Sequence, residues 1–307
     1  MRVVFMGSPA FAVPTLKTLS EQYSVVALIC QPDRPAGRGR ASRPPATKVF
    51  AVEAGIPVLQ PHRLRDAEVI SHIAGLQPEL VVVAAYGQIL PQSLLDQSEN
   101  GSLNVHASLL PRWRGAAPIQ SAILSGDKQS GVTIMQMDAG LDTGPILSQR
   151  KVRIEQDETG GALTMRLSHL GAELLIESLP GYLSRELTPV PQDETLSTYA
   201  PLLKKTDGAL DLQETAEHLA RQIRAFDPWP GTYIQWDDRR LAVKRAHTVP
   251  HNHTIAGEIA LVDRTPAIGT RQGLLVLDRV QPSGKREMSG EAFIRGAPKF
   301  VGAQLLT

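Results

Sequence analysis

The sequence predicts an α/β protein in which a domain built on a mostly parallel sheet precedes a smaller domain of short strands. Strand-like and helix-like segments alternate through the first half of the chain, and such alternation is typical of a parallel sheet covered by helices on both faces. The run Leu80–Ala85 (LVVVAA) is continuously apolar, as expected of a central parallel strand. After residue 231, several short strand-like segments are separated by turns, which favours a small β-barrel.

The first elements follow from apolar spacing and turn residues. Arg2–Met6 is predicted to form a buried strand, and Gly7-Ser8-Pro9 a turn in which Ser8 caps a helix and Pro9 occupies its first position. A glycine here suggests a dinucleotide site, but GSPAF lacks the three-glycine spacing of that fingerprint. We therefore exclude nicotinamide and flavin cofactors. The other predicted elements before residue 100 are helices at 10–19, 46–54 and 67–76, and strands at 23–30, 57–59 and 80–85.

From Gly131 onward the pattern changes. Two predicted strands, 131–137 and 146–154, flank the turn-rich segment DAGLDTGP, and a long helix is expected over 159–183. Few apolar repeats and several prolines predict an interdomain linker at 189–206, between a domain of residues 1–188 and one of residues 207–307. Trp229 is expected to be a packing residue where the second domain begins. The predicted C-terminal elements are a helix at 215–225 and strands at 232–236, 241–246, 257–262, 267–270 and 274–281.

Composition narrows the class of protein. With 42% hydrophobic and 21% charged residues in 307, the chain has a globular composition, and its net charge of +1 indicates no particular charged partner. Cys30, the only cysteine, ends the apolar run VVALIC, so we expect a buried structural thiol and neither a disulfide nor a cysteine-built metal site. No signal peptide or membrane span is apparent. We expect a cytoplasmic protein that does not contact a membrane.

The segment Ser102–Gln120 (SLNVHASLLPRWRGAAPIQ) is the most informative for chemistry. Its start alternates apolar and polar residues, so Asn104 and His106 face the same way on a strand. An amide and an imidazole that emerge together suit a reaction with a tetrahedral intermediate, because both can donate a hydrogen bond to an oxyanion and the imidazole can shuttle a proton. The alternative is that both are hydrogen-bonded structural residues at a sheet end.

A second segment, Met135–Ile146 (MQMDAGLDTGPI), carries two carboxylates in a glycine-containing loop, Asp138 and Asp142. A carboxylate beside a histidine can fix the imidazole tautomer and raise its basicity. The alternative is an ordinary Asp-Gly turn.

A third segment, Gln31–Pro45 (QPDRPAGRGRASRPP), concentrates arginines among glycines and prolines, with Asp33 as the only acid. Guanidinium groups suit phosphate contacts, and the absence of apolar anchors predicts a mobile loop. A solvated charged loop is the alternative. The arginines are Arg34, Arg38, Arg40 and Arg43.

Taken together, these motifs resemble the 10-formyltetrahydrofolate-dependent formyltransferases. NVHASLLPRWRGAAPIQ followed by GVTIMQMDAGLDTGPIL is similar to the core signature of that family, and QPDRPAGRGR is similar to its tRNA-acting members. The likeness extends from MRVVFMGSPAFAVPTL through IRAFDPWPGTY to QPSGKREMSG. Ala107, where glycine is also common, and Pro145, where a polar residue can occur, depart modestly from the pattern.

The resemblance implies a Rossmann-like catalytic domain and an OB-like C-terminal barrel that binds tRNA. It implies that the formyl group of 10-formyltetrahydrofolate, a co-substrate, passes directly to the α-amino group of initiator methionyl-tRNA through a tetrahedral intermediate. This transfer supplies translation initiation and requires no metal, and we expect a monomer.

The resemblance also assigns residues. It implies that Asn104, His106 and Asp142 are catalytic, whereas Asp138 is not. Residues implied to lie against the folate are Tyr86, Gly87, Gln88, Ile89, Leu90, Ser108, Leu109, Leu110 and Pro111. The tRNA contacts are implied for Arg34, Arg38, Arg40 and Arg43, with Arg38 foremost.

Two rival functions remain open on the sequence. The same trio would serve an enzyme that formylates a purine-pathway ribonucleotide or an amino-sugar nucleotide, although neither acceptor requires the arginine-rich loop or the added C-terminal barrel. A noncatalytic RNA- or folate-binding protein could keep the fold. The joint presence of Asn104, His106 and Asp142 argues against this second reading.

Overall fold

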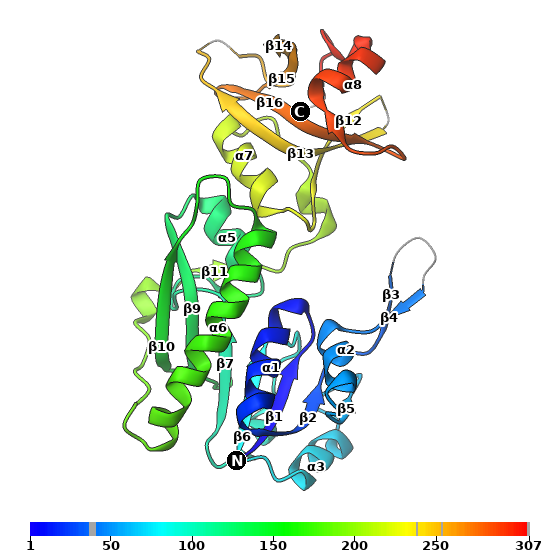
Figure 1. Ribbon diagram of the computed structural model, residues 1–307. Coiled ribbons are helices and arrows are strands. Elements are labelled where there is room, and N and C mark those ends of the chain that lie inside the picture. Colours follow the sequence, from blue (N-terminus) through cyan, green and yellow to red (C-terminus); the bar gives the residue numbers. More distant parts are fainter. Residues whose placement is uncertain (37–40, 238, 253, 306–307) are drawn as a thin grey trace. The chain divides into compact units, whose positions relative to one another are not determined.

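The structure, a computed structural model, describes residues 1–36, 41–237, 239–252 and 254–305 (Figure 1). The chain divides into two compact units, which are described separately. The first unit comprises Met1–Pro118, Gln129–Arg153 and Thr164–Pro201. The second comprises Ile119–Lys128, Ile154–Leu163 and Leu202–Thr307.

A seven-stranded sheet forms the core of the first unit, in the order β10-β9-β7-β6-β1-β2-β5. The five strands from β5 to β7 along this order pair in parallel, whereas β9 and β10 run antiparallel to their neighbours. Every residue of β6 and β7 is buried, as expected of central strands. The bounds are β1 Arg2–Gly7, β2 Ser24–Ile29, β5 Val58–Leu59, β6 Leu80–Ala84, β7 Ser102–His106, β9 Gln129–Gln136 and β10 Ile146–Arg153.

The predicted helices before residue 100 are present, with one change at the first turn. A 3₁₀ turn, η1 (Ala10–Ala12), precedes α1 (Val13–Gln22), and Pro9 rather than Ser8 is the N-cap of η1. The prediction that Ser8 caps a helix is therefore wrong. Its hydroxyl instead accepts a hydrogen bond from Gln31 N (3.0 Å) and donates to the Tyr86 carbonyl (3.5 Å), which joins the loops after β1, β2 and β6. The other helices are α2 Ala46–Glu53, α3 Ala67–Gly75 and α4 Gln92–Leu95.

The long helix α6 (Gly160–Leu183) covers the strand on which Asn104 and His106 lie. A Cβ on its Gly171 would come within 2.6 Å of Val105 Cγ1 in β7. Glycine at this position therefore lets the helix approach the sheet closely.

Short elements complete the first unit. β3 (Arg34–Ala36) and β4 (Ala41–Arg43) form an antiparallel pair. The predicted linker contains a 3₁₀ turn, η2 (Glu194–Leu196), and β11 (Tyr199–Ala200), which pairs in parallel with β8 (Arg114–Gly115).

The second unit is built on an antiparallel sheet in the order β12-β13-β16-β15-β14, with β17 paired to β16. Register shifts in the β13–β16 pair bend the two longest strands. The strands are β12 Thr232–Trp236, β13 Arg239–Val249, β14 Ile259–Val262, β15 Thr265–Gly269, β16 Leu274–Pro282 and β17 Met288–Ser289. The helical elements are α5 Pro118–Ser125, η3 Lys205–Gly208, α7 Ala216–Ala225, α8 Gly290–Gly296 and η4 Pro298–Phe300. The predicted α/β class with an additional C-terminal β domain is confirmed.

The core of the second unit lies under α7, α8 and η4, where Trp236, Phe293 and Phe300 make three edge-to-face ring contacts. Such contacts stabilise beyond the burial of apolar area. Trp229 is 53% exposed, so its predicted packing role is wrong, and Trp236 fills that role on β12. Across the described residues, no helix is both long enough and apolar enough to cross a bilayer.

We predict that Phe300→Ala lowers the free energy of unfolding by about 3–5 kcal/mol, because the substitution leaves a cavity beside two rings. Urea denaturation followed by near-ultraviolet circular dichroism measures the loss. Val301→Ala, next along the chain and 36% exposed, is the control, and its effect should stay near 0.5 kcal/mol. Equal losses in both variants would contradict the assignment of Phe300 to this core.

Candidate functional site

The carboxyl end of β7 presents two polar side chains on one face of the sheet. Asn104 and His106 are two residues apart on the strand and only 8% and 6% exposed. Polar groups buried to this degree require hydrogen-bond partners. The sequence prediction that they emerge together is therefore met by the geometry.

Asp142 supplies the partner from the loop between β9 and β10. Its Oδ1 accepts a hydrogen bond from Asn104 Nδ2 at 3.4 Å, and its Oδ2 lies 3.7 Å from His106 Nδ1. The backbone of Asp142 is left-handed, with φ of 53°, a conformation that Asp adopts more readily than most residues. The structure thus brings Asn104, His106 and Asp142 to one place.

Asp138, the other carboxylate of the loop, makes hydrogen bonds within the loop itself. Its Oδ1 accepts hydrogen bonds from Gly140 N (3.0 Å) and Thr143 Oγ1 (2.7 Å). This is a local turn of the kind that Asp-Gly sequences form. The alternative interpretation of this segment, an ordinary Asp-Gly turn, therefore applies to Asp138. Asp142 instead reaches the β7 side chains Asn104 and His106.

The second ring nitrogen of His106 is also occupied. Nε2 lies 3.0 Å from the carbonyl oxygen of Trp113. A carbonyl can only accept, so Nε2 carries the proton of this contact. In the neutral ring, Nδ1 is then a lone pair directed at the Asp142 carboxylate, and one further proton between them would make the contact attractive.

Gly115 completes the contacts of the carboxylate, and sequence reasoning missed it. Its N–H donates to Asp142 Oδ2 at 2.9 Å. Its φ is 114°, and a Cβ there would lie 2.6 Å from the Ala200 carbonyl, so the position requires glycine. The only signal in the sequence was a glycine directly after RWR.

The neighbouring arginines differ in role. The Arg112 guanidinium lies 4.4 Å from the centre of the Trp113 ring. Arg114 is 8% exposed and donates to the carboxylate of Glu194, which raises the pKa of the guanidinium. In return, Arg114 lowers the pKa of the Glu194 carboxyl group. Arg114 is therefore committed to a contact within the protein.

The loop after β6 carries the first group of predicted folate residues. Tyr86 is buried. Its burial, and to a smaller extent its proximity to Cys30, raises the pKa of the Tyr86 hydroxyl to about 12. Its carbonyl accepts from Gln31 Nε2 at 3.3 Å. Gln88 Oε1 accepts from Leu64 N at 3.0 Å, which holds the loop. Of the others, Gly87 has a positive φ, Leu90 is buried and Ile89 is 83% exposed.

Cys30 is fully buried at the end of β2, as predicted for a structural thiol. Burial raises the pKa of this thiol to about 11.

The second group, Ser108-Leu109-Leu110-Pro111, forms a turn directly after β7. The buried Thr133 on β9 fixes this turn, because its hydroxyl donates to the Ser108 carbonyl (2.6 Å) and accepts from Leu110 N (3.1 Å). Gln149 Nε2 donates to the same hydroxyl (2.9 Å) and to the Leu110 carbonyl (2.8 Å). The Leu110–Pro111 peptide bond is cis. Sequence reasoning identified neither Thr133 nor Gln149.

The arginine-rich segment forms a short strand pair where the structure describes it. Its two ends form the β3–β4 pair, in which Arg34 lies opposite Arg43 and both are exposed. Backbone pairing therefore gives these ends a secondary structure that the sequence analysis did not include, and the mobility of the loop stays a prediction. Arg38 and Arg40 lie outside the described residues.

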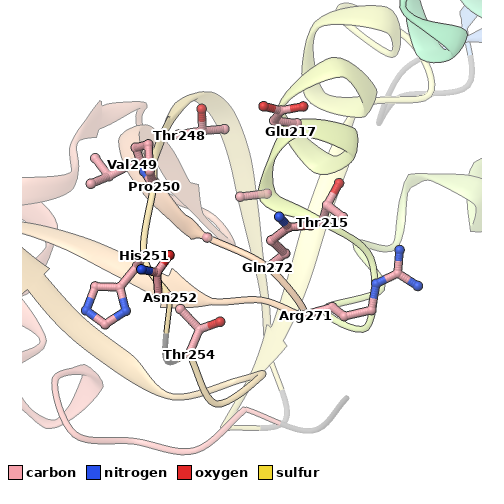
Figure 2. Close-up of a pocket in the computed structure, with 12 residues that line it drawn as sticks. Thr215, Glu217, Thr248, Val249, Pro250, His251, Asn252, Thr254, Arg271 and Gln272 are labelled. Atoms are coloured by element: carbon pink, nitrogen blue, oxygen red, sulfur yellow. The ribbon is translucent and has the colours of Figure 1, made fainter.

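No candidate metal centre competes with this site in the part of the chain that is described. No group of three or more potential metal-ligating side chains occurs among those residues. A cavity of about 480 Å³ lies in the second unit, lined by the start of α7, by the end of β13 with the residues after it, and by the residues just before β16 (Figure 2). Arg271 and His251 stand at opposite parts of its lining and do not converge on one point.

The chain is similar to known proteins in both sequence and fold. Residues 1–179 match the family described as formyl transferase, and residues 202–298 match the formyl transferase C-terminal domain. A methionyl-tRNA formyltransferase from Bacillus pumilus is 48% identical over 309 residues, covering 99% of this chain and 97% of the relative. Another from Citrifermentans bemidjiense is 48% identical over 300 residues, covering 96% and 93%.

Solved structures share the fold at lower identity. A sugar 3N-formyltransferase, determined with dTDP and 5-N-formyl-THF, superposes with a TM-score of 0.66 at 17% identity, covering 93% of this chain and 99% of that one. HypX from Aquifex aeolicus in complex with tetrahydrofolic acid gives a TM-score of 0.64 at 17% identity, covering 98% of this chain and 48% of that one.

We predict that Thr133→Val lowers the free energy of unfolding by about 1–3 kcal/mol. The substitution keeps the shape of the side chain but leaves Leu110 N buried without its acceptor. Chemical denaturation measures the loss, and Thr18→Val, which removes a single bond within α1, should change stability by only about 0.5 kcal/mol. A Thr133→Val protein as stable as the parent would show that the turn does not depend on this hydroxyl.

Proposed function

Because the chain belongs to the methionyl-tRNA formyltransferase family, we propose that Asn104, His106 and Asp142 are its catalytic residues. The chain is a formyltransferase that uses 10-formyltetrahydrofolate and acts on methionyl-tRNA. The observation that carries the catalytic assignment is the convergence on one carboxylate. Asn104 Nδ2 lies 3.4 Å from Asp142 Oδ1, and His106 Nδ1 lies 3.7 Å from Asp142 Oδ2.

The reaction is a direct transfer without a formyl-enzyme intermediate. The neutral amine attacks the formyl carbon, a C–N bond forms, and the carbonyl pair moves onto oxygen. Asn104 Nδ2 and His106 Nε2 donate to that oxygen. For His106 this means that the oxyanion replaces the Trp113 carbonyl as acceptor, since a charged oxygen accepts more strongly than a neutral carbonyl. Collapse restores the formyl C=O and breaks its bond to N10 of the folate.

The proton of the incoming amine goes to the pair formed by Asp142 and His106. With Nε2 protonated, the free acceptors of the pair are Nδ1 of the imidazole and the carboxylate oxygens. They face each other across 3.7 Å, so a proton received by one of them, directly or through a water, is stabilised by the other. The same proton then serves the folate nitrogen that leaves.

The two folate segments flank β7 on adjacent connections of the sheet. Tyr86–Leu90 follows β6, which pairs with β7, and Ser108–Pro111 follows β7 itself. Ile89 offers an exposed apolar side chain for the flat pterin ring, and the turn held by Thr133 presents a fixed backbone edge. The co-substrate lies along these segments, with its formyl group at His106 and Asn104.

The β3–β4 pair contacts the tRNA. Arg34 and Arg43 are directly opposite each other, and like charges so placed repel. Asp33 does not relieve this repulsion, because it pairs with Lys48 at 2.8 Å, a contact that lowers the pKa of the Asp33 carboxyl group. A phosphate between the two guanidinium groups removes the repulsion. We also assign tRNA contacts to Arg38 and Arg40, which lie outside the described residues, from the resemblance of the sequence alone.

The remaining assignments complete the proposal. Residues 1–188 carry the reaction, 189–206 connect the domains, and 207–307 form an OB-like domain that binds the initiator tRNA. The protein acts as a monomer in the cytoplasm, without membrane contact, to supply translation initiation.

We predict that Asp142→Asn lowers kcat for formyl transfer by about 10²–10⁴-fold at saturating folate and tRNA, because the amide cannot accept the amine proton. Initial rates with charged initiator tRNA measure the effect. Asp138→Asn is the matched control in the same loop and should retain activity. Near-normal turnover in Asp142→Asn would reject the catalytic role of this carboxylate.

The same assay, run on the parent protein with an amino-sugar nucleotide or a purine-pathway ribonucleotide in place of tRNA, tests the acceptor. Transfer to a small amine alone would reject the tRNA assignment.

We predict that the double variant Arg34→Ala/Arg43→Ala weakens tRNA binding and makes it less dependent on salt. Each lost phosphate contact should reduce the slope of log affinity against log salt concentration by about 1, so the pair should reduce it by about 2. Filter binding at several salt concentrations gives the slope. Lys17→Ala, an exposed cation on α1, should leave it unchanged. An unchanged slope in the double variant would exclude phosphate contacts by these arginines.

A further inference from the structure

The segment 190–200, called the strap below, is hydrogen-bonded to both loops that form the site. At its start, Val190 and Ile146 exchange two backbone hydrogen bonds of 2.8 and 2.7 Å. At its end, β11 pairs with β8, and the Ala200 carbonyl accepts from Ala116 N at 2.9 Å. Between them, Thr198 accepts from both Trp113 N (2.8 Å, through its hydroxyl) and Arg114 N (2.9 Å, through its carbonyl). The strap is thus more than a connection between domains.

Gln192 is the side chain of the strap that reaches the Asp142 loop. Its Nε2 donates to the Asp142 carbonyl at 2.8 Å and to the Gly144 carbonyl at 2.7 Å. Its Oε1 accepts from Arg114 Nε (3.1 Å) and Nη2 (2.8 Å). Carbonyls only accept and a guanidinium only donates, so one orientation of the amide satisfies all four bonds.

One of these two carbonyls belongs to Asp142 itself, and the other belongs to Gly144, two residues further along the loop. Asp142 has a left-handed backbone, and non-glycine residues hold that conformation only when their surroundings enforce it. Gly144 is also tightly placed, because a Cβ there would lie 1.9 Å from the Gln136 carbonyl. The Gln192 amide therefore fixes the backbone from which the carboxylate reaches Gly115, Asn104 and His106.

The strap also holds the opposite loop. Arg114 is clamped by Gln192 and by two bonds of 2.8 Å to Glu194. The residues on either side of Arg114 are Trp113, whose carbonyl contacts His106 Nε2, and Gly115, whose N–H contacts Asp142 Oδ2. The Gln192 side chain therefore links the backbone of the Asp142 loop to the segment around Arg114, which contacts His106 and Asp142.

We infer that Gln192 is a positioning residue for formyl transfer, holding the Asp142 carboxylate against Gly115, Asn104 and His106 through its two N–H donors. Gln192 touches none of the reacting atoms. The inference rests on the proposed roles of the trio, and it assigns to the strap a part in catalysis in addition to its connection of the domains.

Two substitutions separate this role from a general structural one. Gln192→Met has nearly the same length but removes all four hydrogen bonds. Gln192→Glu keeps the acceptor for Arg114 and removes only the two donors to the Asp142 loop. If the contact with Arg114 were what mattered, Gln192→Glu would behave as the parent protein. If the donors matter, both variants are impaired.

Hydrogen exchange at Gly115 reports the carboxylate position without an activity assay. In the parent protein, Gly115 N–H donates to Asp142 Oδ2, so its exchange is slowed. We predict that both Gln192 variants exchange Gly115 N–H at least about tenfold faster, because the acceptor moves away. We also predict that kcat falls by about 10- to 100-fold, as a misplacement of about 1 Å can cause, while KM for folate and for tRNA stays within about twofold.

Gln97→Met is the matched control. Gln97 is also half-buried and also donates to a backbone carbonyl, that of Ile70 at 3.2 Å, but far along the chain from the strap. In Gln97→Met, the hydrogen-exchange rate of Gly115 N–H and the kcat for formyl transfer should equal those of the parent protein.

Each outcome decides the matter. Faster exchange together with lower kcat in both Gln192 variants supports the inference. Unchanged Gly115 exchange overturns it, and so does faster exchange with a normal kcat, or an equal loss of kcat in Gln97→Met. A parent protein that formylates no methionyl-tRNA would instead refute the proposed function, whereas the exchange measurement would still decide whether Gln192 holds the carboxylate.

Discussion

The site depends on one carboxylate that joins three separate parts of the chain. Asp142 lies 27 residues beyond Gly115, whose N–H it accepts, and 38 beyond Asn104. Without it, the buried amide of Asn104 would lose its acceptor, and the loop after β7 would lose its contact with the loop after β9. Because polar groups with so little exposure need partners, the arrangement that suits catalysis is also the one that satisfies the fold.

The imidazole is constrained from both sides by this arrangement. The Trp113 carbonyl selects the Nε2–H tautomer, and the Asp142 carboxylate then faces a lone pair. Two acceptors that face each other are a poor contact until a proton enters between them. The geometry of this pair therefore fits the proposed role of accepting the amine proton.

Sequence patterns predicted the features that depend on neighbouring residues, and they missed the contacts between residues far apart in the sequence. The N-x-H pattern places two side chains on one face because strands alternate, and the elements 1–100 follow from apolar spacing, apart from the cap assigned to Ser8. Gly115, Thr133 and Gln192 were not found, because each acts on residues far away in sequence and its own neighbours give no sign of it. The sequence of the strap predicts only a linker, since its short pairing with β8 depends on tertiary contacts and carries no periodicity of its own.

The fold does not by itself select the acceptor. A sugar 3N-formyltransferase structure covers 93% of this chain, and that share is too large to omit residues 207–307. The C-terminal sheet domain therefore cannot distinguish a tRNA enzyme from a sugar enzyme by its presence, contrary to the expectation that a small acceptor does not require it. What separates them must lie in surface chemistry. In the described part of the first unit, the proposed tRNA contact rests on the opposed pair Arg34 and Arg43. Asp33 is paired with Lys48 and does not relieve their repulsion, whereas a phosphate-rich acceptor would relieve it.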